Sequence, residues 1–123
     1  EKNIDVTNTP KASTAATAEL TFGLVLAIAR RIVEGDKLSR TKGFDGWAPL
    51  FFRGREVSGK TLGIIGFGEI GSAVAKRAKG FDMDILYTGP HQKKEKEREI
   101  GAKYVDLDTL YCLFSQCRAW TNR

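Results

Sequence analysis

The apolar and polar positions of residues 61–88 follow two different periods, which predict a strand, a helix and a second strand. Thr61–Ile65 is a short apolar run with β-branched side chains, as is typical of a strand buried on both faces. Residues 72–79 are rich in alanine, and Asp84–Thr88 has the pattern of another strand. The apolar positions between the strands share one helical stripe: Ile70, Val74 and Ala78. The pattern therefore predicts a βαβ unit with two parallel strands.

The same alternation of helix and strand continues towards the C-terminus. Residues 91–99 alternate in charge sign, as a solvated helix face does, and Gly101 is expected to end that helix. Ala102–Asp106 is predicted as a third strand, and Asp108 as the cap of a short helix through Leu113. The order β-α-β-α-β is half of a doubly wound sheet. The predicted fold class is α/β, a partial Rossmann-like parallel sheet preceded by a long helix.

That long helix is predicted over residues 12–36, beginning after Pro10 and capped by Ser13 or Thr14. Its apolar positions form one wide face: Leu20, Phe22, Leu24, Val25, Leu26, Ile28, Ala29, Ile32 and Val33. So wide a face exceeds what one sheet contact requires, and we expect the helix to lie between layers or between subunits. Upstream of it, the alternation of Ile4–Thr7 predicts a short strand.

Residues 39–59 have the composition of a loop, with four glycines and one proline. This loop nevertheless carries large apolar side chains that need a surface to cover them: Phe44, Trp47, Leu50, Phe51 and Phe52. Two interpretations stay open. The rings pack on their own domain, or the loop is an arm that packs against a partner subunit.

The candidate chemistry lies at the turn after the first strand, where three glycines have the spacing Gly66-x-Gly68-x-x-Gly71. In a dinucleotide-binding turn the first glycine allows the sharp bend, the second lets the backbone approach a pyrophosphate, and the third lets the helix lie close to the strand. The helix start then offers N–H groups and a positive dipole end to the anion. The motif alone also fits a flexible glycine-rich turn, but the flanking strand and helix favour a dinucleotide site that includes Glu69 and Ile70.

Composition excludes several other classes of function. The net charge is +5, but residues 1–60 carry ten basic and seven acidic groups and residues 61–123 carry ten and eight, so no concentrated nucleic-acid patch is expected. The longest apolar run, Phe22–Ala29, is too short to span a bilayer. Two cysteines and one histidine make a four-ligand zinc site improbable, and no metal site is assigned. We expect a cytoplasmic protein with free thiols.

Several separate motifs, in order, closely resemble the D-isomer-specific 2-hydroxyacid dehydrogenases. The matching segments are Val6–Pro10, Ala16–Glu19, Gly46–Leu50, Gly59–Gly66 and Leu86–Gly89. The Trp-x-Pro-Leu and Tyr-Thr-Gly pieces are most similar to the glyoxylate and hydroxypyruvate reductase branch, with D-3-phosphoglycerate and D-lactate dehydrogenases as alternatives. One departure is Lys11, which stands where the family usually has glycine.

The resemblance implies a division of the chain into five parts. Residues 1–11 correspond to the end of a substrate-domain segment, 12–40 to an interdomain or dimer helix, 41–59 to the aromatic arm and 60–114 to a dinucleotide-binding half-domain. Residues 115–123 form a tail that does not resemble the family's next strand. Because the family pairs its subunits through the helix and arm, we expect a homodimer, with Trp47 in the contact.

The resemblance also implies NAD(P)-dependent reduction of a 2-keto acid, in which a His donates a proton and an Arg orients the carboxylate. The family's catalytic Arg, Glu and His lie beyond the third strand, so no catalytic residue is assigned and His91 does not match. We expect the chain alone to bind NAD or NADP without turnover. A non-catalytic dinucleotide-binding scaffold remains the alternative.

The choice between NAD and NADP depends on the end of the second strand, where an acidic residue usually binds the ribose 2′-hydroxyl. That position is Gly89, so no carboxylate there repels a 2′-phosphate. Pro90 follows, and His91, Lys93 and Lys94 are close enough in sequence to reach a phosphate, unless the lysines only belong to a solvated helix. Relatives that prefer NADP often have arginine at Pro90. We therefore expect NADPH to be accepted with at most a modest preference over NADH.

Overall fold

A computed structural model describes residues 4–41, 46 and 50–118 of the chain, with the backbone alone for 114–118. The elements in order are α1 (Thr14–Ala29), α2 (Ile32–Thr41), β1 (Thr61–Ile65), α3 (Glu69–Lys79), β2 (Asp84–Thr88), α4 (Lys94–Ile100), β3 (Ala102–Tyr104) and α5 (Leu107–Arg118). The predicted α/β fold with alternating strands and helices is confirmed. Among the described residues, no helix has the length and apolar character needed to cross a membrane.

The three strands form a parallel sheet in the order β1-β2-β3. Thr61 lies opposite Asp84 and Ile65 lies opposite Thr88, while Ala102 of β3 lies opposite Ile85. The bounds of β1 and β2 are those predicted from the sequence, whereas β3 ends at Tyr104, two residues earlier than expected. Because the strands are parallel, their carboxyl ends meet at one edge of the sheet, where ligands of such sheets bind.

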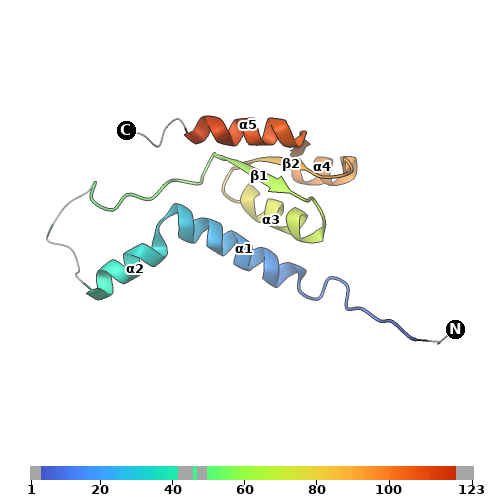
Figure 1. The fold of residues 1–123 in the computed structure, drawn as a ribbon, viewed down its shortest axis with the longest axis horizontal. Coiled ribbons are helices and arrows are strands. Elements are labelled where there is room, and N and C mark those ends of the chain that lie inside the picture. Colours follow the sequence, from blue (N-terminus) through green and yellow to red (C-terminus); the bar gives the residue numbers. More distant parts are fainter. Residues whose placement is uncertain (1–3, 42–45, 47–49, 119–123) are drawn as a thin grey trace.

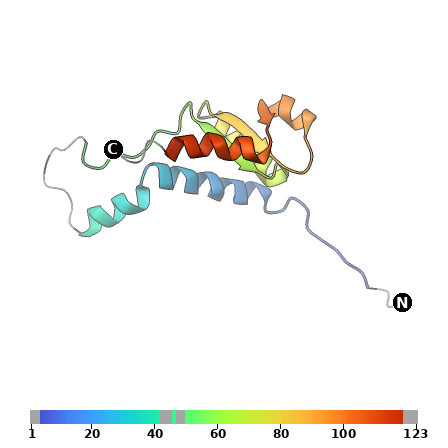
Figure 2. The same ribbon diagram turned by 45° about the horizontal axis from the view of Figure 1, so that its top comes forward.

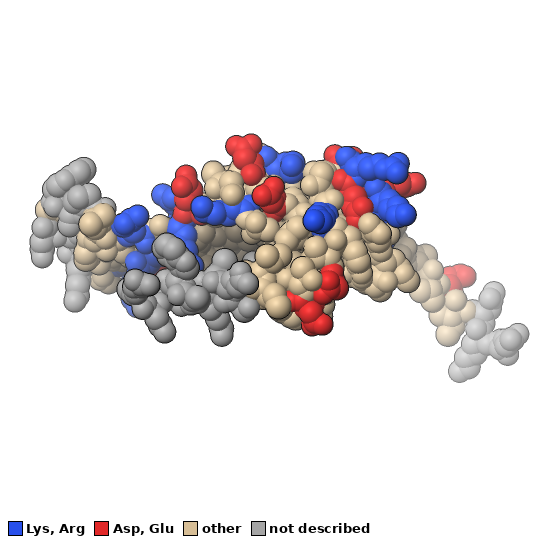
Figure 3. Space-filling view, turned by 90° about the horizontal axis from the view of Figure 1, so that it is seen from above, with Lys and Arg blue, Asp and Glu red and all other residues tan. Residues whose placement is uncertain are grey.

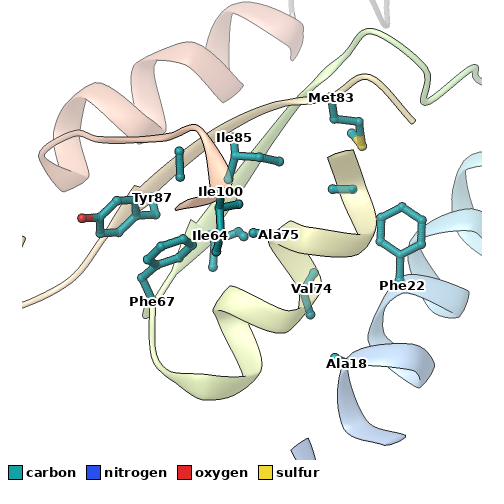
Figure 4. Packing of buried hydrophobic residues seen from close by; sticks show 12 residues of the cluster. Ala18, Phe22, Ile64, Phe67, Val74, Ala75, Met83, Ile85, Tyr87 and Ile100 are labelled. Atoms are coloured by element: carbon teal, nitrogen blue, oxygen red, sulfur yellow. The ribbon is translucent and has the colours of Figure 1, made fainter. Parts of the chain in front are cut away.

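The elements are arranged in layers, with α3 between the sheet and α1, and α5 on the opposite face of the sheet (Figures 1 and 2). The core lies mainly between the sheet and α3, and α1 contributes Ala18 and Phe22 to it (Figure 4). An ion pair of 2.9 Å between Arg77 and Glu19 also joins α3 to α1. On the other face of the sheet, Leu110 of α5 is buried.

The single long helix predicted over residues 12–36 is wrong, because the chain breaks it at Arg30 and Arg31. Arg31 has a φ of 56°, in the left-handed region, and its guanidinium pairs with Glu34 and lies 4.3 Å from the ring centre of Phe52. The break lets residues 54–55 return beside the end of α1. The Arg55 N–H donates to the Ala29 carbonyl at 2.6 Å, and a Cβ on Gly54 would come within 2.7 Å of the Arg30 Cα.

The wide apolar face of α1 is divided between two environments. Ala18 and Phe22 point towards α3 and are 0% and 6% exposed. Leu20, Leu24 and Ile28 lie on the other side and are 67%, 53% and 78% exposed. Only one side of α1 therefore packs against another layer of the structure, and the other side is exposed.

The predicted strand over Ile4–Thr7 is wrong, since these residues are exposed and belong to no strand. Ser13 does occupy the cap position of α1, although its side chain makes no capping hydrogen bond. Lys11 has a φ of 66°, a left-handed conformation that glycine adopts without steric cost. This conformation gives a physical reason for the glycine that the family usually has at that position.

The aromatic loop packs in part on its own domain. Phe52 lies against Gly35 and Arg31 of the same chain, whereas Phe51 and Leu50 are 56% and 72% exposed. Trp47, with Phe44, lies outside the described residues. The interpretation as an arm against a partner therefore stays open for the exposed side chains.

The capping prediction for the last helix is also wrong. Asp106, not Asp108, caps α5, because its carboxylate accepts hydrogen bonds from the Thr109 N–H at 2.7 Å and from the Thr109 hydroxyl at 2.6 Å. These bonds lower the pKa of Asp106. Capping at Asp106 follows from the early end of β3, and the helix then continues to Arg118, beyond the expected end at Leu113.

Candidate dinucleotide-binding site

The glycine turn connects β1 to α3, and two of its three glycines are required by the geometry of the chain itself. Gly66 has a φ of +93°, which side chains rarely permit. A Cβ on Gly71 would lie 2.3 Å from the Gly66 carbonyl oxygen and 3.3 Å from a methyl carbon of Ile64. The start of α3 is therefore held directly against the end of β1, as the motif predicts.

Gly68 differs from the other two glycines because a Cβ there would meet no atom within 4 Å. It is the residue before α3, with extended backbone angles, and the first helical hydrogen bond runs from the Ser72 N–H to its carbonyl at 3.0 Å. The N–H groups of Glu69, Ile70 and Gly71 precede that bond and lie at the positive end of the helix dipole. Open space next to these N–H groups fits an approaching pyrophosphate.

The end of β2 lies next to the same turn. The Gly66 N–H donates to the Thr88 carbonyl at 2.9 Å, and a Cβ on Gly89 would lie 4.0 Å from the Phe67 backbone nitrogen. Gly66, Gly68 and Gly89 are thus brought together at the carboxyl edge of the sheet. Pro90 and Lys93 follow in the segment that joins β2 to α4 and are exposed.

That segment, residues 89–93, is held at both ends by phenol hydroxyls, one from the buried Tyr87 and one from the partly buried Tyr104. The Tyr104 hydroxyl donates to the Gly89 carbonyl at 3.1 Å. The Tyr87 hydroxyl accepts the Lys93 N–H at 2.8 Å and donates to Glu97 at 2.7 Å. Tyr87 is 0% exposed, and its burial raises the pKa of the phenol. The hydrogen bond from Tyr87 lowers the pKa of Glu97.

An aromatic contact joins the glycine turn to this segment. The rings of Phe67 and Tyr87 are stacked with their centres 4.1 Å apart, and Figure 4 shows them side by side at the carboxyl edge of the sheet. Tyr104 meets Tyr87 edge to face at 5.4 Å. Sequence reasoning missed Tyr87, Glu97 and Phe67, although a tyrosine at an inward strand position signals a hydroxyl that needs a partner.

The charges around the site are of both signs. Glu69, in the first turn of α3, accepts a hydrogen bond from Lys96 at 2.9 Å, and this bond lowers the pKa of Glu69. Lys93 and Lys94 form no ion pair with the part of the chain that the structure describes. Figure 3 shows basic and acidic side chains interleaved on one face of the molecule, not gathered into a single basic patch. No cluster that suits a metal ion occurs within residues 4–41, 46 and 50–118.

The comparisons with known proteins agree with this geometry. The family pattern described as "D-isomer specific 2-hydroxyacid dehydrogenase, NAD binding domain" matches residues 22–117. The chain belongs to the D-isomer specific 2-hydroxyacid dehydrogenases. The family resemblance and the Rossmann-like fold expected from the motifs are thereby confirmed, and the match to an NAD-binding domain supports NAD as a cofactor.

The match with this chain covers only part of the length of each relative. A Staphylococcus haemolyticus protein whose name places it among the 2-hydroxyacid dehydrogenases is 93% identical over 110 residues, which are 89% of this chain and 35% of that protein. A glyoxylate reductase structure from Paecilomyes thermophila is 37% identical with a TM-score of 0.71, over 83% of this chain and 30% of that one.

A D-lactate dehydrogenase structure from Aquifex aeolicus, in complex with NAD and lactic acid, is 30% identical with a TM-score of 0.71. The match covers 83% of this chain and 30% of that one. The chain therefore spans about a third of the length of the relatives it matches.

Proposed function

We propose that this dehydrogenase chain binds a nicotinamide dinucleotide at the carboxyl edge of its sheet. The pyrophosphate lies over Gly68 and the first N–H groups of α3, and the adenosine ribose lies over Gly89. The observation that carries this proposal is the open space next to Gly68. That space lies beside the start of α3, which Gly71 allows to lie close to β1. A family match to an NAD-binding domain supports it independently.

In the full-length enzyme, we propose, the bound cofactor supplies hydride to the keto carbon of a 2-keto acid. This chain contributes binding and orientation of the cofactor, and no catalytic Arg, Glu or His is assigned within it. Glyoxylate or hydroxypyruvate is the proposed substrate, on the strength of the Gly46–Leu50 and Leu86–Gly89 motifs. D-lactate and D-3-phosphoglycerate are the alternative substrates, and a cytoplasmic location is the proposed one.

For the cofactor, we propose that NADPH is accepted with at most a modest preference over NADH. Gly89 places no carboxylate at the end of β2, and Lys93 and Lys94 are exposed. Lysine acts on a phosphate as a point charge and not as a bidentate fork, so the preference is small. Pro90, in place of an arginine, limits it further.

We also propose that the chain forms a homodimer through the outer side of α1. Leu20, Leu24 and Ile28 line that side, and Ile32 and Val33 of α2 are 54% and 73% exposed next to it in sequence. A second copy would cover the same apolar residues symmetrically, as a two-fold interface requires. Trp47 is expected in the contact.

The proposed function is tested by titrating the purified chain with NADH and with NADPH in a calorimeter, at low and at high salt. Binding of both cofactors without turnover of glyoxylate or hydroxypyruvate is the expected result. Absence of binding by a folded chain would contradict the proposed site. Turnover would show that the chain carries catalytic residues which the sequence analysis did not assign. A hundred-fold preference for NADH would show that Gly89 is not the discriminating position.

A further inference from the structure

The segment that follows β2 is held by hydrogen bonds to two tyrosine side chains of the sheet. Residues 89–93 carry no regular structure, yet the carbonyl at one end and the N–H at the other are both bonded to phenols of the sheet. Here the position is set by Tyr104 and Tyr87.

Tyr87 is the centre of this arrangement. Its hydroxyl donates to Glu97 and accepts from the Lys93 N–H, so both of its hydrogen-bonding functions are used. The Glu97 carboxylate also accepts hydrogen bonds from the Gln92 amide at 3.1 Å and 3.2 Å. Gln92, the residue before Lys93, is therefore bound to the same carboxylate as Tyr87. The ring of Tyr87 stacks on Phe67 of the glycine turn.

From this geometry we propose that Tyr87 is a positioning residue that fixes residues 89–93 for reading the 2′-substituent of the cofactor's adenosine ribose. The inference rests on the proposed dinucleotide site. The reason is that the Tyr87 hydroxyl holds the backbone of Lys93. The side chain of Lys93 is one of the cations available to bind a 2′-phosphate. A fixed backbone lowers the ordering cost of that contact, and the contact exists only with NADPH.

The proposal predicts an unequal effect on the two cofactors. Tyr87→Phe keeps the ring and its stacking on Phe67 but removes the hydroxyl. Loss of one hydrogen bond that orders the segment is expected to weaken NADPH binding about fivefold to tenfold. NADH binding, which depends on the glycine turn, is expected to change by less than about twofold.

The test measures dissociation constants of NADPH and NADH for the parent chain, Tyr87→Phe and Tyr111→Phe. Tyr111 is an exposed tyrosine of α5 whose hydroxyl makes no hydrogen bond with residues 89–93, so Tyr111→Phe should leave both dissociation constants close to those of the parent. Amide hydrogen exchange without cofactor gives a second readout. The Lys93 N–H should exchange faster in Tyr87→Phe, while the Ser72 N–H of α3 should not.

The possible outcomes separate the two proposals. If the parent binds neither cofactor, the dinucleotide site itself is wrong and the inference falls with it. If the parent binds both and Tyr87→Phe weakens both equally, Tyr87 has only a structural role and the inference alone is overturned. Unchanged exchange at Lys93 would also overturn it.

Discussion

Gly71 and Gly66 approach so closely that a single methyl group on Gly71 would lie 2.3 Å from the Gly66 carbonyl oxygen. Real Cβ atoms do not come so near to a backbone oxygen, so the start of α3 can lie at this distance from β1 only with glycine at position 71. The contact fixes where α3 begins, and with it the direction of the N–H groups proposed to receive the pyrophosphate.

Gly71→Ala is expected to lower the free energy of unfolding by about 3 kcal/mol, because the overlap forces α3 away from β1. Urea denaturation followed by circular dichroism measures this change. Gly68→Ala is the matched control, since a Cβ there meets open space, and its stability should lie within about 0.5 kcal/mol of the parent. Equal stability of the two variants would contradict the close approach.

Gly68→Val is expected to abolish dinucleotide binding while leaving the fold intact. The side chain fills the space that the proposed pyrophosphate needs, and it meets no atom of the chain itself. Calorimetry with NADH and NADPH on the folded variant, beside the parent, provides the measurement. Binding as tight as that of the parent would exclude the proposed role of Gly68.

Leu24→Lys is expected to convert a dimer into a monomer, because it places a charge at the centre of the exposed apolar side of α1. Light scattering over a range of concentrations reports the change in mass. Ser39→Lys adds the same charge to an exposed polar position on α2 and should leave the dimer unchanged. A parent chain that is monomeric at high concentration would contradict the proposed interface.

Asp106 gives a pH-dependent prediction. Its hydrogen bonds to Thr109 lower its pKa below the ordinary value of 3.8, so the folded state holds the charged form more strongly than the unfolded state does. The stabilisation is therefore present above about pH 4 and is lost as the pH falls through the lowered pKa. Asp106→Asn should show a shallower loss of Tm between about pH 5 and pH 2 than the parent. An equal loss of Tm with falling pH in the parent and in Asp106→Asn would contradict this cap.

The sequence was sufficient where local periodicity decides the structure. The bounds of β1 and β2 and the end of α4 at Gly101, whose φ is +74°, all follow from short-range patterns. The glycine spacing also predicted the strand-to-helix turn, because Gly66 and Gly71 each meet a separate geometric requirement of that turn.

Contacts between distant residues were beyond the reach of such patterns. The break at Arg31 contains no glycine or proline, and it accompanies a hydrogen bond from Arg55, far along the chain. The link from Tyr87 to Glu97 and Lys93 likewise depends on how α4 packs against α3 and β3. Nothing in the local sequence around Asp106 showed that β3 stops at Tyr104 and leaves Asp106 to cap α5.

The most direct test of the dinucleotide site is a nuclear magnetic resonance titration of the 15N-labelled chain with NADPH. We expect saturable shifts of the backbone amides at Gly68, Glu69 and Ile70, together with those of residues 89–93. Amides of α2, which lies far from the glycine turn in Figure 1, should not shift. Saturable binding that shifts α2 and leaves the amides at the start of α3 unchanged would contradict the account.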